Sequence, residues 1–206
     1  MTSLCINIDN GPEWELAKQE FERIGIEVER FPAIVEDNRV LAFNKSVYAA
    51  LQLMPEGGWL FEDDVQFDGS LEEVKAALRI MPSDMLTFHL GCNIIGSDLT
   101  TWKMPEFYGP GLVKLWNCWQ THANYYSAEC VKFILENLPY VTDDYKTEGC
   151  IIFDEWLRNN VLSQGRSYLL NPMIAYQRPR HSAIWNVESN YTGAHKQGNS
   201  WLKENV

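Results

Sequence analysis

The chain has 206 residues, 46% of them hydrophobic and 22% charged, which is enough to bury a core without disulfide bonds or structural metal ions. Its 17 Lys and Arg stand against 28 Asp and Glu, and the resulting net charge of −11 repels polyanions and disfavours nucleic acid as a partner. No apolar run reaches the length of about 18 residues that a membrane span needs, so we expect no transmembrane segment.

The first 34 residues predict a βαβ unit. The apolar run Leu4–Ile8 predicts a buried strand that ends in a turn rich in Asp, Asn, Gly and Pro. Apolar residues within Trp14–Ile24 recur at spacings of three and four, which is typical of a helix with one buried face. Glu27–Ile34 predicts a second strand, and parallel pairing is expected for two strands joined by a helix.

The next segment predicts a helix and then a strand that ends in acidic residues. Phe43–Leu53 is expected to be helical and to stop before a segment rich in Pro and Gly. The apolar run Trp59–Phe61 predicts a short strand that leads directly into Glu62-Asp63-Asp64. Ser70 and Glu73 have the spacing of a capping box, which opens another helix.

The centre of the chain predicts three strands separated by a long loop. Asp84–Gly91 predicts the first strand, and Cys92–Pro110 has the composition of a loop with functional content. Leu112–Trp116 and Thr121–Tyr126 predict the other two strands, and a helix is expected to start near Ser127.

The last third predicts a helix, a strand and an irregular tail. Ile151–Val161 is expected to be helical, Tyr168–Tyr176 is expected to be one strand, and the chain from Gln177 onward shows little periodicity. Because there is no internal repeat and no linker, we expect a single α/β domain over residues 1–206, with a mostly parallel mixed sheet flanked by helices.

Three consecutive carboxylates at the end of an apolar strand are costly unless a cation compensates them. In open α/β sheets, ligands bind at the carboxyl ends of the strands. Carboxylate oxygens suit Mg²⁺ or Mn²⁺, which in turn bridge to the phosphates of a nucleotide. Glu62-Asp63-Asp64 therefore predicts a metal and nucleotide site, and the alternative is a solvated acidic loop.

The cysteines and the aromatic residues are open to simpler interpretations. Five Cys with no Cys-x-x-Cys pair predict buried free thiols and no zinc site, and the absence of a signal peptide predicts a cytoplasmic protein. Trp102, Trp116 and Trp119 are candidates for a wall that stacks on an acceptor sugar, although core packing explains each equally well.

An ordered set of short segments resembles glycosyltransferase family 25, which includes lipooligosaccharide and collagen galactosyltransferases. No single motif is specific, but the set follows the family's order over most of residues 3–186. Two positions depart from the pattern, since Phe43-Asn44-Lys45-Ser46 replaces a Ser-His pair and Ala183 replaces an Asp. The matching segments are Leu4–Asp9, Pro12-Glu13, Ile24-Gly25-Ile26, Arg30-Phe31-Pro32-Ala33, Trp59–Val65, Thr121–Ser127, Asp154, Pro172, Gln177 and Ser182-Ala183-Ile184.

The resemblance implies a GT-A fold, a nucleotide-diphosphate-sugar donor such as a UDP-sugar, and Mn²⁺ or Mg²⁺. The implied reaction moves a hexose, with inversion, to a hydroxyl of a glycan or glycoconjugate acceptor, as in lipopolysaccharide biosynthesis. It also implies that residues 1–95 form the half that binds the nucleotide sugar and that residues 96–206 form the acceptor half.

The resemblance also suggests metal ligands and a catalytic base. Asp64 is the first candidate for direct metal ligation, with Glu62 as a second ligand or a ribose contact and His181 completing the shell. Asp154 is the candidate general base and Glu155 the alternative. A helix N-cap is the competing interpretation of Asp154, because Asp favours that position.

Further residues are expected to contact the donor. Asp9 and Asn10, in the turn after the first strand, would contact the nucleotide base or ribose. Arg178 and Arg180 would bind the diphosphate through paired hydrogen bonds. Asp63 and Ser182 complete the predicted donor contacts.

Three other functions fit parts of the same pattern. A glycosyltransferase that acts on modified DNA bases would need a basic groove, which the net charge disfavours. An inactive sugar-binding protein would keep the fold without the chemistry. A phosphotransferase would also use strand-end carboxylates, but the sequence contains no phosphate loop of the Walker type.

Overall fold

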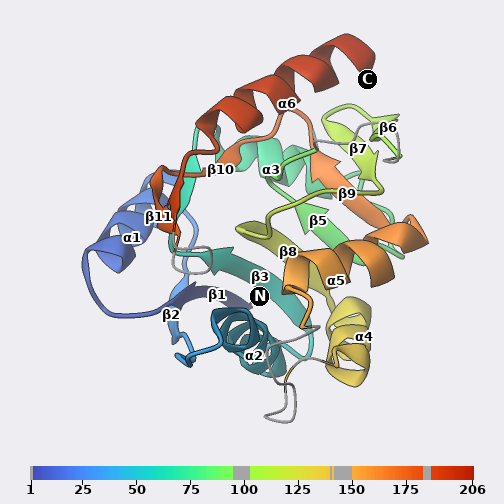
Figure 1. Ribbon diagram of the computed structural model, residues 1–206. Helices are drawn as coiled ribbons and strands as arrows, with labels where there is room; N and C mark the ends of the chain where they lie inside the picture. The colour runs from blue at the N-terminus through green and yellow to red at the C-terminus, as the bar shows by residue number, and fades with distance from the viewer. Residues whose placement is uncertain (1, 95–102, 140, 142–149, 183–186) are drawn as a thin grey trace.

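An eight-stranded mixed sheet forms the centre of the protein (Figure 1). The structure is a computed structural model, and it describes residues 2–94, 103–139, 141, 150–182 and 187–206. The β1–β2, β1–β3 and β5–β9 pairs are parallel and the other four pairs of the sheet are antiparallel. In spatial order the strands are β2 (Glu29–Pro32), β1 (Thr2–Asn7), β3 (Gly57–Glu62), β8 (Ala123–Ser127), β5 (Thr87–His89), β9 (Ser167–Leu170), β7 (Leu112–Leu115) and β6 (Glu106–Gly109).

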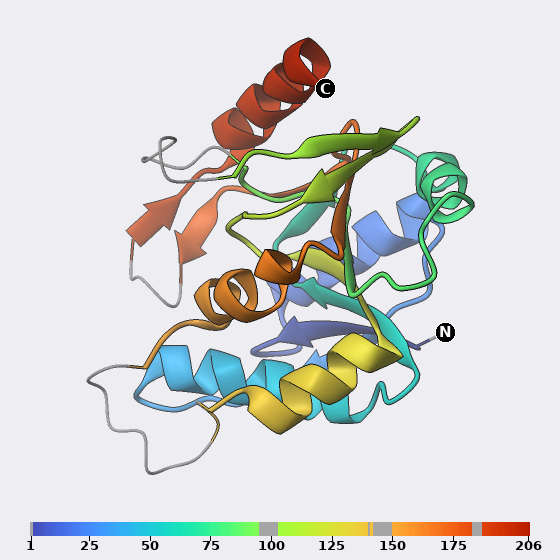
Figure 2. The ribbon, with the colours of Figure 1, turned by 90° about the vertical axis from the view of Figure 1, so that its right-hand side faces the viewer.

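Helices cover both faces of this sheet (Figure 2). Helices α1 (Pro12–Ile24) and α3 (Leu71–Leu78) bury their apolar sides on one face, against side chains such as Trp59 and Phe61. Helices α2 (Arg39–Gln52), α4 (Ala128–Asn137) and α5 (Phe153–Asn160) cover the other face. The predicted class, an α/β fold with helices flanking a large sheet, is confirmed.

Two small antiparallel sheets and a last helix lie beside the main sheet. Strand β4 (Val65–Phe67) pairs with β10 (Ala175–Gln177), and β11 (Arg180–Ser182) pairs with β12 (Val187–Ser189). The 3-10 turn η1 (Leu162–Gln164) follows α5, and helix α6 (Thr192–Asn205) ends the chain. Because β4 directly follows the acidic triplet, this arrangement brings the chain from Ala175 onward to the end of β3.

The elements expected in the first half of the chain are confirmed. Strands β1 and β2 are parallel and α1 joins them, ending at Gly25 in a left-handed conformation with φ 81°. Helix α2 starts four residues before the predicted start, because the side chain of Asn38 accepts a hydrogen bond from the backbone N–H of Leu41 and caps it there. The capping box of Ser70 and Glu73 opens α3 as expected.

In the second half, strands β5, β7 and β8 and helices α4 and α5 form where they were expected, but three other expectations need correction. The predicted single strand Tyr168–Tyr176 is two strands, β9 and β10, and the segment between them contains a cis Asn171–Pro172 bond. The predicted loop Cys92–Pro110 contains strand β6, and its residues 95–102 lie outside the described part of the chain. The tail, which shows little periodicity, contains the 14-residue helix α6. None of the described helices is long and apolar enough to cross a bilayer.

Strand β3 lies inside the sheet between β1 and β8, and every residue from Gly57 to Phe61 is buried. Its aromatic residues pack closely: the rings of Trp59 and Phe61 are stacked with their centroids 5.9 Å apart, and the ring of Phe21 is tilted against that of Phe61 at a centroid distance of 5.0 Å. A strand anchored in this way holds the residues that follow it in one place. The triplet that begins with Glu62 is therefore presented at a rigid edge of the sheet.

Replacing Asn199 with Ala tests how α6 is attached. The Asn199 amide accepts a hydrogen bond from the backbone N–H of Met173 at 2.8 Å and donates one to the Met173 carbonyl at 2.9 Å. Because Met173 is buried, both of its backbone groups would lose their partner, and we expect a loss of roughly 2 kcal/mol in the free energy of unfolding.

Asn205→Ala is the matched control, since Asn205 lies on the same helix and donates to the Trp201 carbonyl at an exposed site. Urea denaturation of both variants measures the difference. Equal destabilisation by the two substitutions would show that the Met173 contacts do not attach the helix.

Candidate functional site

A cavity of about 650 Å³ opens at the carboxyl ends of β1, β2 and β3. This is the edge at which open α/β sheets bind ligands, and the volume lies within the range of about 300–1,000 Å³ that is usual for ligand pockets. Among its lining residues are the whole acidic triplet, Gln120, Asp154, Gln177, Arg178 and Arg180. The pocket therefore collects side chains from segments that are far apart in the sequence.

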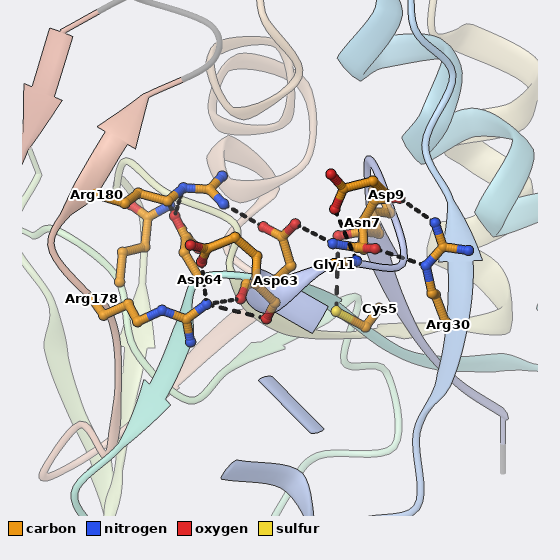
Figure 3. A network of polar contacts seen from close by, with 12 residues as sticks. Cys5, Asn7, Asp9, Gly11, Arg30, Asp63, Asp64, Arg178 and Arg180 are labelled. Atoms are coloured by element: carbon orange, nitrogen blue, oxygen red, sulfur yellow. Dashed lines mark hydrogen bonds and ion pairs between the residues drawn. The ribbon is translucent and has the colours of Figure 1, made fainter. Parts of the chain in front are cut away.

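Glu62 is the last residue of β3, and Asp63 and Asp64 form the turn to β4, which we call the acidic turn. Both Asp residues are almost fully buried. Asp63 is 5% exposed and Asp64 is 4% exposed. The Asn7 amide, at the end of β1, donates to Asp63 Oδ2 at 2.7 Å, and Arg30 donates to Asn7 Oδ1 at 2.7 Å. Strands β1 and β2 thus hold one side of the turn (Figure 3).

Two arginines hold the other side of the turn. Arg180 contacts Asp63 Oδ1 at 2.5 Å through Nη1 and Asp64 Oδ2 at 3.1 Å through Nε. Arg178 donates to the Asp63 carbonyl at 2.6 Å and to Glu13 Oε2 at 2.5 Å, so it also ties the start of α1 to the turn. Figure 3 shows both guanidinium groups pointing at the turn from the side opposite Asn7.

Burial and like charge dominate the electrostatics of the pocket. Burial raises the pKa of Asp64 to about 6, although Arg180 acts in the opposite direction. Burial also raises the pKa of Glu62 well above its usual value, and the neighbouring Asp64 and Asp154 raise it further. Burial alone would lower the pKa of Arg180, but Asp64 and Asp63 raise it, so this arginine stays charged.

Asp154 faces the same pocket from the first turn of α5. The N-cap of this helix is Ile152, so the interpretation of Asp154 as the cap residue is wrong. The backbone N–H of Gln120, a residue with φ 76°, donates to Asp154 Oδ2 at 3.2 Å. Asp154 Oδ1 is buried and has no hydrogen-bond partner among the described residues, and burial raises the pKa of this carboxyl.

Glu62 connects the acidic turn to the segment that carries Gln120. Thr121 donates its hydroxyl to Glu62 Oε1 at 3.1 Å, and the backbone N–H of Glu62 donates to the His122 carbonyl at 3.0 Å. Glu62 and Asp154 both line the pocket and bond to adjacent residues of one segment. The pocket therefore has carboxylates on two of its walls.

Several predicted site residues do not line the cavity. Asp9 and Asn10 are exposed, and Asp9 accepts a hydrogen bond from the backbone N–H of Gly11 within its own turn. Glu155 pairs with Arg158 at 3.6 Å, away from the pocket lining. His181 is exposed on β11 and pairs with Glu188 at 3.2 Å, and the side chain of Ser182 lies outside the described part of the structure.

The tryptophans expected at an acceptor wall lie elsewhere in the described structure. Lys103 Nζ stands 3.2 Å from the ring centroid of Trp116, and the Arg158 guanidinium stands 4.2 Å from that of Trp119. Neither tryptophan lines the cavity. Trp102 lies outside the described residues.

An apolar wall of the pocket was not expected from the sequence. It consists of Ile8, Ile34, Val35 and Phe43, from the turn after β1, the segment after β2, and α2. Ile8, Ile34 and Val35 are 53%, 36% and 70% exposed, and because they line one cavity together they form an apolar patch rather than scattered surface residues. The sequence signal was the continuation of the apolar run of β2 beyond its last strand residue.

The predicted divalent metal fits this arrangement poorly. Both carboxylate oxygens of Asp63 and of Asp64 already accept hydrogen bonds or ion pairs, from Arg180, Asn7 and Gln177. Asp64 and Glu62, the other two predicted ligands, line the cavity, whereas His181 does not line it and pairs with Glu188 instead. In this structure a guanidinium compensates the charge that a metal ion was expected to compensate.

Comparisons with known proteins support the fold and leave the family open. The solved structure of A197 from STIV is similar to this chain, with a TM-score of 0.50 and 14% sequence identity over 91% of this chain and 93% of that chain. A glycosyltransferase involved in the glycosylation of the major capsid of PBCV-1 matches over 98% of both chains with 10% identity and a TM-score of 0.45, a likeness from which we draw no conclusion. No protein-family model and no curated protein matches the chain, so the resemblance to glycosyltransferase family 25 stays a prediction.

Replacing Arg180 with Met tests whether the arginine is the cation of the acidic turn. The substitution would leave Asp63 and Asp64 buried without their compensating charge, and we expect a loss on the order of 3 kcal/mol in the free energy of unfolding at pH 7.

Arg166→Met is the control, because Arg166 is as buried as Arg180, with 26% against 24% exposure, but its partner Glu129 is 62% exposed. We expect this surface pair to contribute about 1 kcal/mol or less. Urea denaturation, which adds no salt, measures the free energy of unfolding of both variants. Equal losses in this free energy would refute the special role of Arg180.

Proposed function

We propose that this protein is a glycosyltransferase that moves a sugar from a nucleotide-diphosphate-sugar to a hydroxyl group of a glycan or glycoconjugate. The observation that carries the proposal is the pocket at the ends of the parallel strands, where paired carboxylates and arginines face a separate carboxylate, Asp154. Such a pocket can hold an anionic donor on one side and deprotonate an acceptor on the other. The resemblance to family 25, which covers the same segments, supports the reaction class.

The donor would lie along β1, β2 and the acidic turn. The apolar wall of Ile8, Ile34, Val35 and Phe43 offers a surface for a nucleobase or ribose. The diphosphate would then come to Arg180, which lines the pocket and stays charged. Arg178 also lines the pocket, but its guanidinium bonds to the Asp63 carbonyl and to Glu13, so it holds the turn in place.

Sugar transfer needs a base for the acceptor hydroxyl. In a single displacement the acceptor oxygen attacks the anomeric carbon and the bond to the diphosphate breaks, with its electron pair staying on the diphosphate. The hydroxyl proton would go to Asp154, whose Oδ1 has no hydrogen-bond partner among the described residues. Because burial raises the pKa of this carboxyl, it holds a proton more firmly than an ordinary Asp would.

One form of the proposal includes Mn²⁺ or Mg²⁺. Asp64 and Glu62 would hold the ion, and its chemistry would be to offset charge on the departing diphosphate. Arg180 would have to give up its contacts with the two Asp residues first. The alternative within the same proposal is that Arg180 supplies this charge without a metal.

A thermal-shift screen of nucleotide sugars tests donor binding. A donor present at 100 times its Kd would add roughly 2.7 kcal/mol to the stability of the folded state, which gives a clear rise in Tm. Running each donor with and without Mn²⁺ separates the two forms of the proposal. If Arg180 supplies the charge, the shift is the same in both conditions, whereas a shift that needs Mn²⁺ would establish metal dependence.

The same screen can refute the proposal. If no common nucleotide sugar raises Tm in either condition, while the protein unfolds cooperatively, the pocket does not bind such a donor.

Replacing Asp154 with Asn tests the base. We expect kcat to fall by at least about 100-fold while the donor-induced thermal shift persists, because Asn keeps the shape but cannot accept the proton. In the wild-type protein kcat should fall as the pH is lowered, with a midpoint above the ordinary Asp value of about 3.9.

Glu136→Gln, at an exposed position of α4, controls for the loss of one carboxylate. Donor-dependent transfer to a glycan acceptor is the measurement. If Glu155→Gln abolishes transfer and Asp154→Asn does not, the base is Glu155 and the assignment to Asp154 is wrong.

A further inference from the structure

A second group of polar side chains lies inside the protein, outside the lining of the pocket. His89 ends β5, Cys92 follows three residues later, and Cys118 lies between β7 and β8. All three side chains are buried, with exposures of 0%, 3% and 3%. We call these three residues the His-Cys-Cys group.

The backbone holds the two cysteines side by side. Asn93 and Trp119 form an isolated antiparallel bridge, with N–H to carbonyl hydrogen bonds of 2.9 and 3.0 Å in the two directions. Gly91 allows a close approach of the segment around Ala175, because a Cβ at this position would overlap the Ala175 carbonyl. As a result, one donor atom from each residue of the group lies within 4.8 Å of the other two.

The imidazole of His89 has one satisfied nitrogen and one that is not. Nε2 lies 3.0 Å from the Thr87 hydroxyl, which itself donates to Ser167 Oγ at 2.8 Å. With the hydroxyl proton directed at Ser167, Thr87 accepts from Nε2–H, and Nδ1 carries a free lone pair. Nδ1 is buried and has no hydrogen-bond partner among the described residues.

We propose that His89, Cys92 and Cys118 bind one Zn²⁺ ion through His89 Nδ1 and the two sulfur atoms. Two thiolates and an imidazole are a donor set that zinc prefers, and they leave one coordination position for a water molecule or another donor. On binding, Zn²⁺ replaces the thiol protons of the two cysteines, which are released to solvent. The hydrogen bond from His89 to Thr87 is the outer contact that commonly orients a ligating histidine.

The five cysteines are free thiols and four of them are buried, as expected, but the proposed site departs from the expectation that they form no zinc site. His89 and Cys92 are three residues apart, but Cys118 joins them only through the Asn93–Trp119 bridge. The ion would stabilise the segment that continues to Gln120, whose N–H bonds to Asp154. The proposal does not depend on the reaction catalysed in the pocket, and its test needs no activity measurement.

The test is metal analysis of the purified protein, followed by Co²⁺ titration of the chelator-treated protein. We expect about one Zn²⁺ per chain, a lower Tm after chelation, and recovery of Tm with Zn²⁺. Co²⁺ should produce thiolate-to-metal charge-transfer absorption that saturates at about one equivalent and is lost when Zn²⁺ is added. These readouts use the unaltered chain, so they hold even if a ligand variant fails to fold.

Variants locate the ion within the chain. Cys118→Ser should abolish the charge-transfer absorption, and Thr87→Val should weaken Zn²⁺ binding by roughly 10- to 100-fold through the outer contact. Cys130→Ser is the matched control, since Cys130 is equally buried but lies at the start of α4, outside the group. It should keep the full signal.

Two results would overturn the proposal. One is a folded wild-type chain that takes up neither Zn²⁺ nor Co²⁺ with thiolate absorption. The other is a disulfide between Cys92 and Cys118, found by mass spectrometry in protein that was never exposed to an oxidant.

Discussion

The structure depends most on the compensation of two buried carboxylates at the end of β3. Asp63 and Asp64 cannot be removed from water unless opposite charge and hydrogen-bond donors come with them. Arg180 brings the charge, and Asn7 brings a donor from β1. These contacts connect the first strands, the acidic turn and the chain after β10 around one pocket. The side chains that stabilise the turn are also those that would contact an anionic ligand, so a substitution there would affect both stability and binding.

Local patterns in the sequence were enough to predict the framework. The βαβ unit, the capping box at Ser70, and a buried strand that delivers Glu62 to the sheet edge all follow from periodicity and short-range capping. Each of these depends on residues within a few positions of one another. The position of the acidic triplet was predictable for the same reason, because the strand before it is a run of apolar residues.

The features that could not be predicted from the sequence depend on contacts between distant residues or have weak local signals. Helix α6 contains Gly193 and Gly198, and its N-cap residue Tyr191 makes no side-chain cap. Of the residues that it buries, which are His195, Gly198 and Leu202, only Leu202 is a large apolar residue, so the periodic pattern is faint. The sequence predicts Arg180 as a phosphate ligand, a role that stays a prediction, but it does not predict the contacts of Arg180 with the acidic turn, which join residues more than 110 positions apart. The apolar wall likewise combines segments that meet only when the parallel strands assemble.

The late position of Arg180 in the chain has a consequence for synthesis on the ribosome. The residues of β1, β2 and β3 all precede Asp63 in the chain and leave the ribosome long before residue 180 does. Until then, Asp63 and Asp64 lack their cation and favour contact with water, which keeps this end of the sheet open. The N-terminal strands can therefore pair early, but the pocket is complete only after residue 180 has been added to the chain.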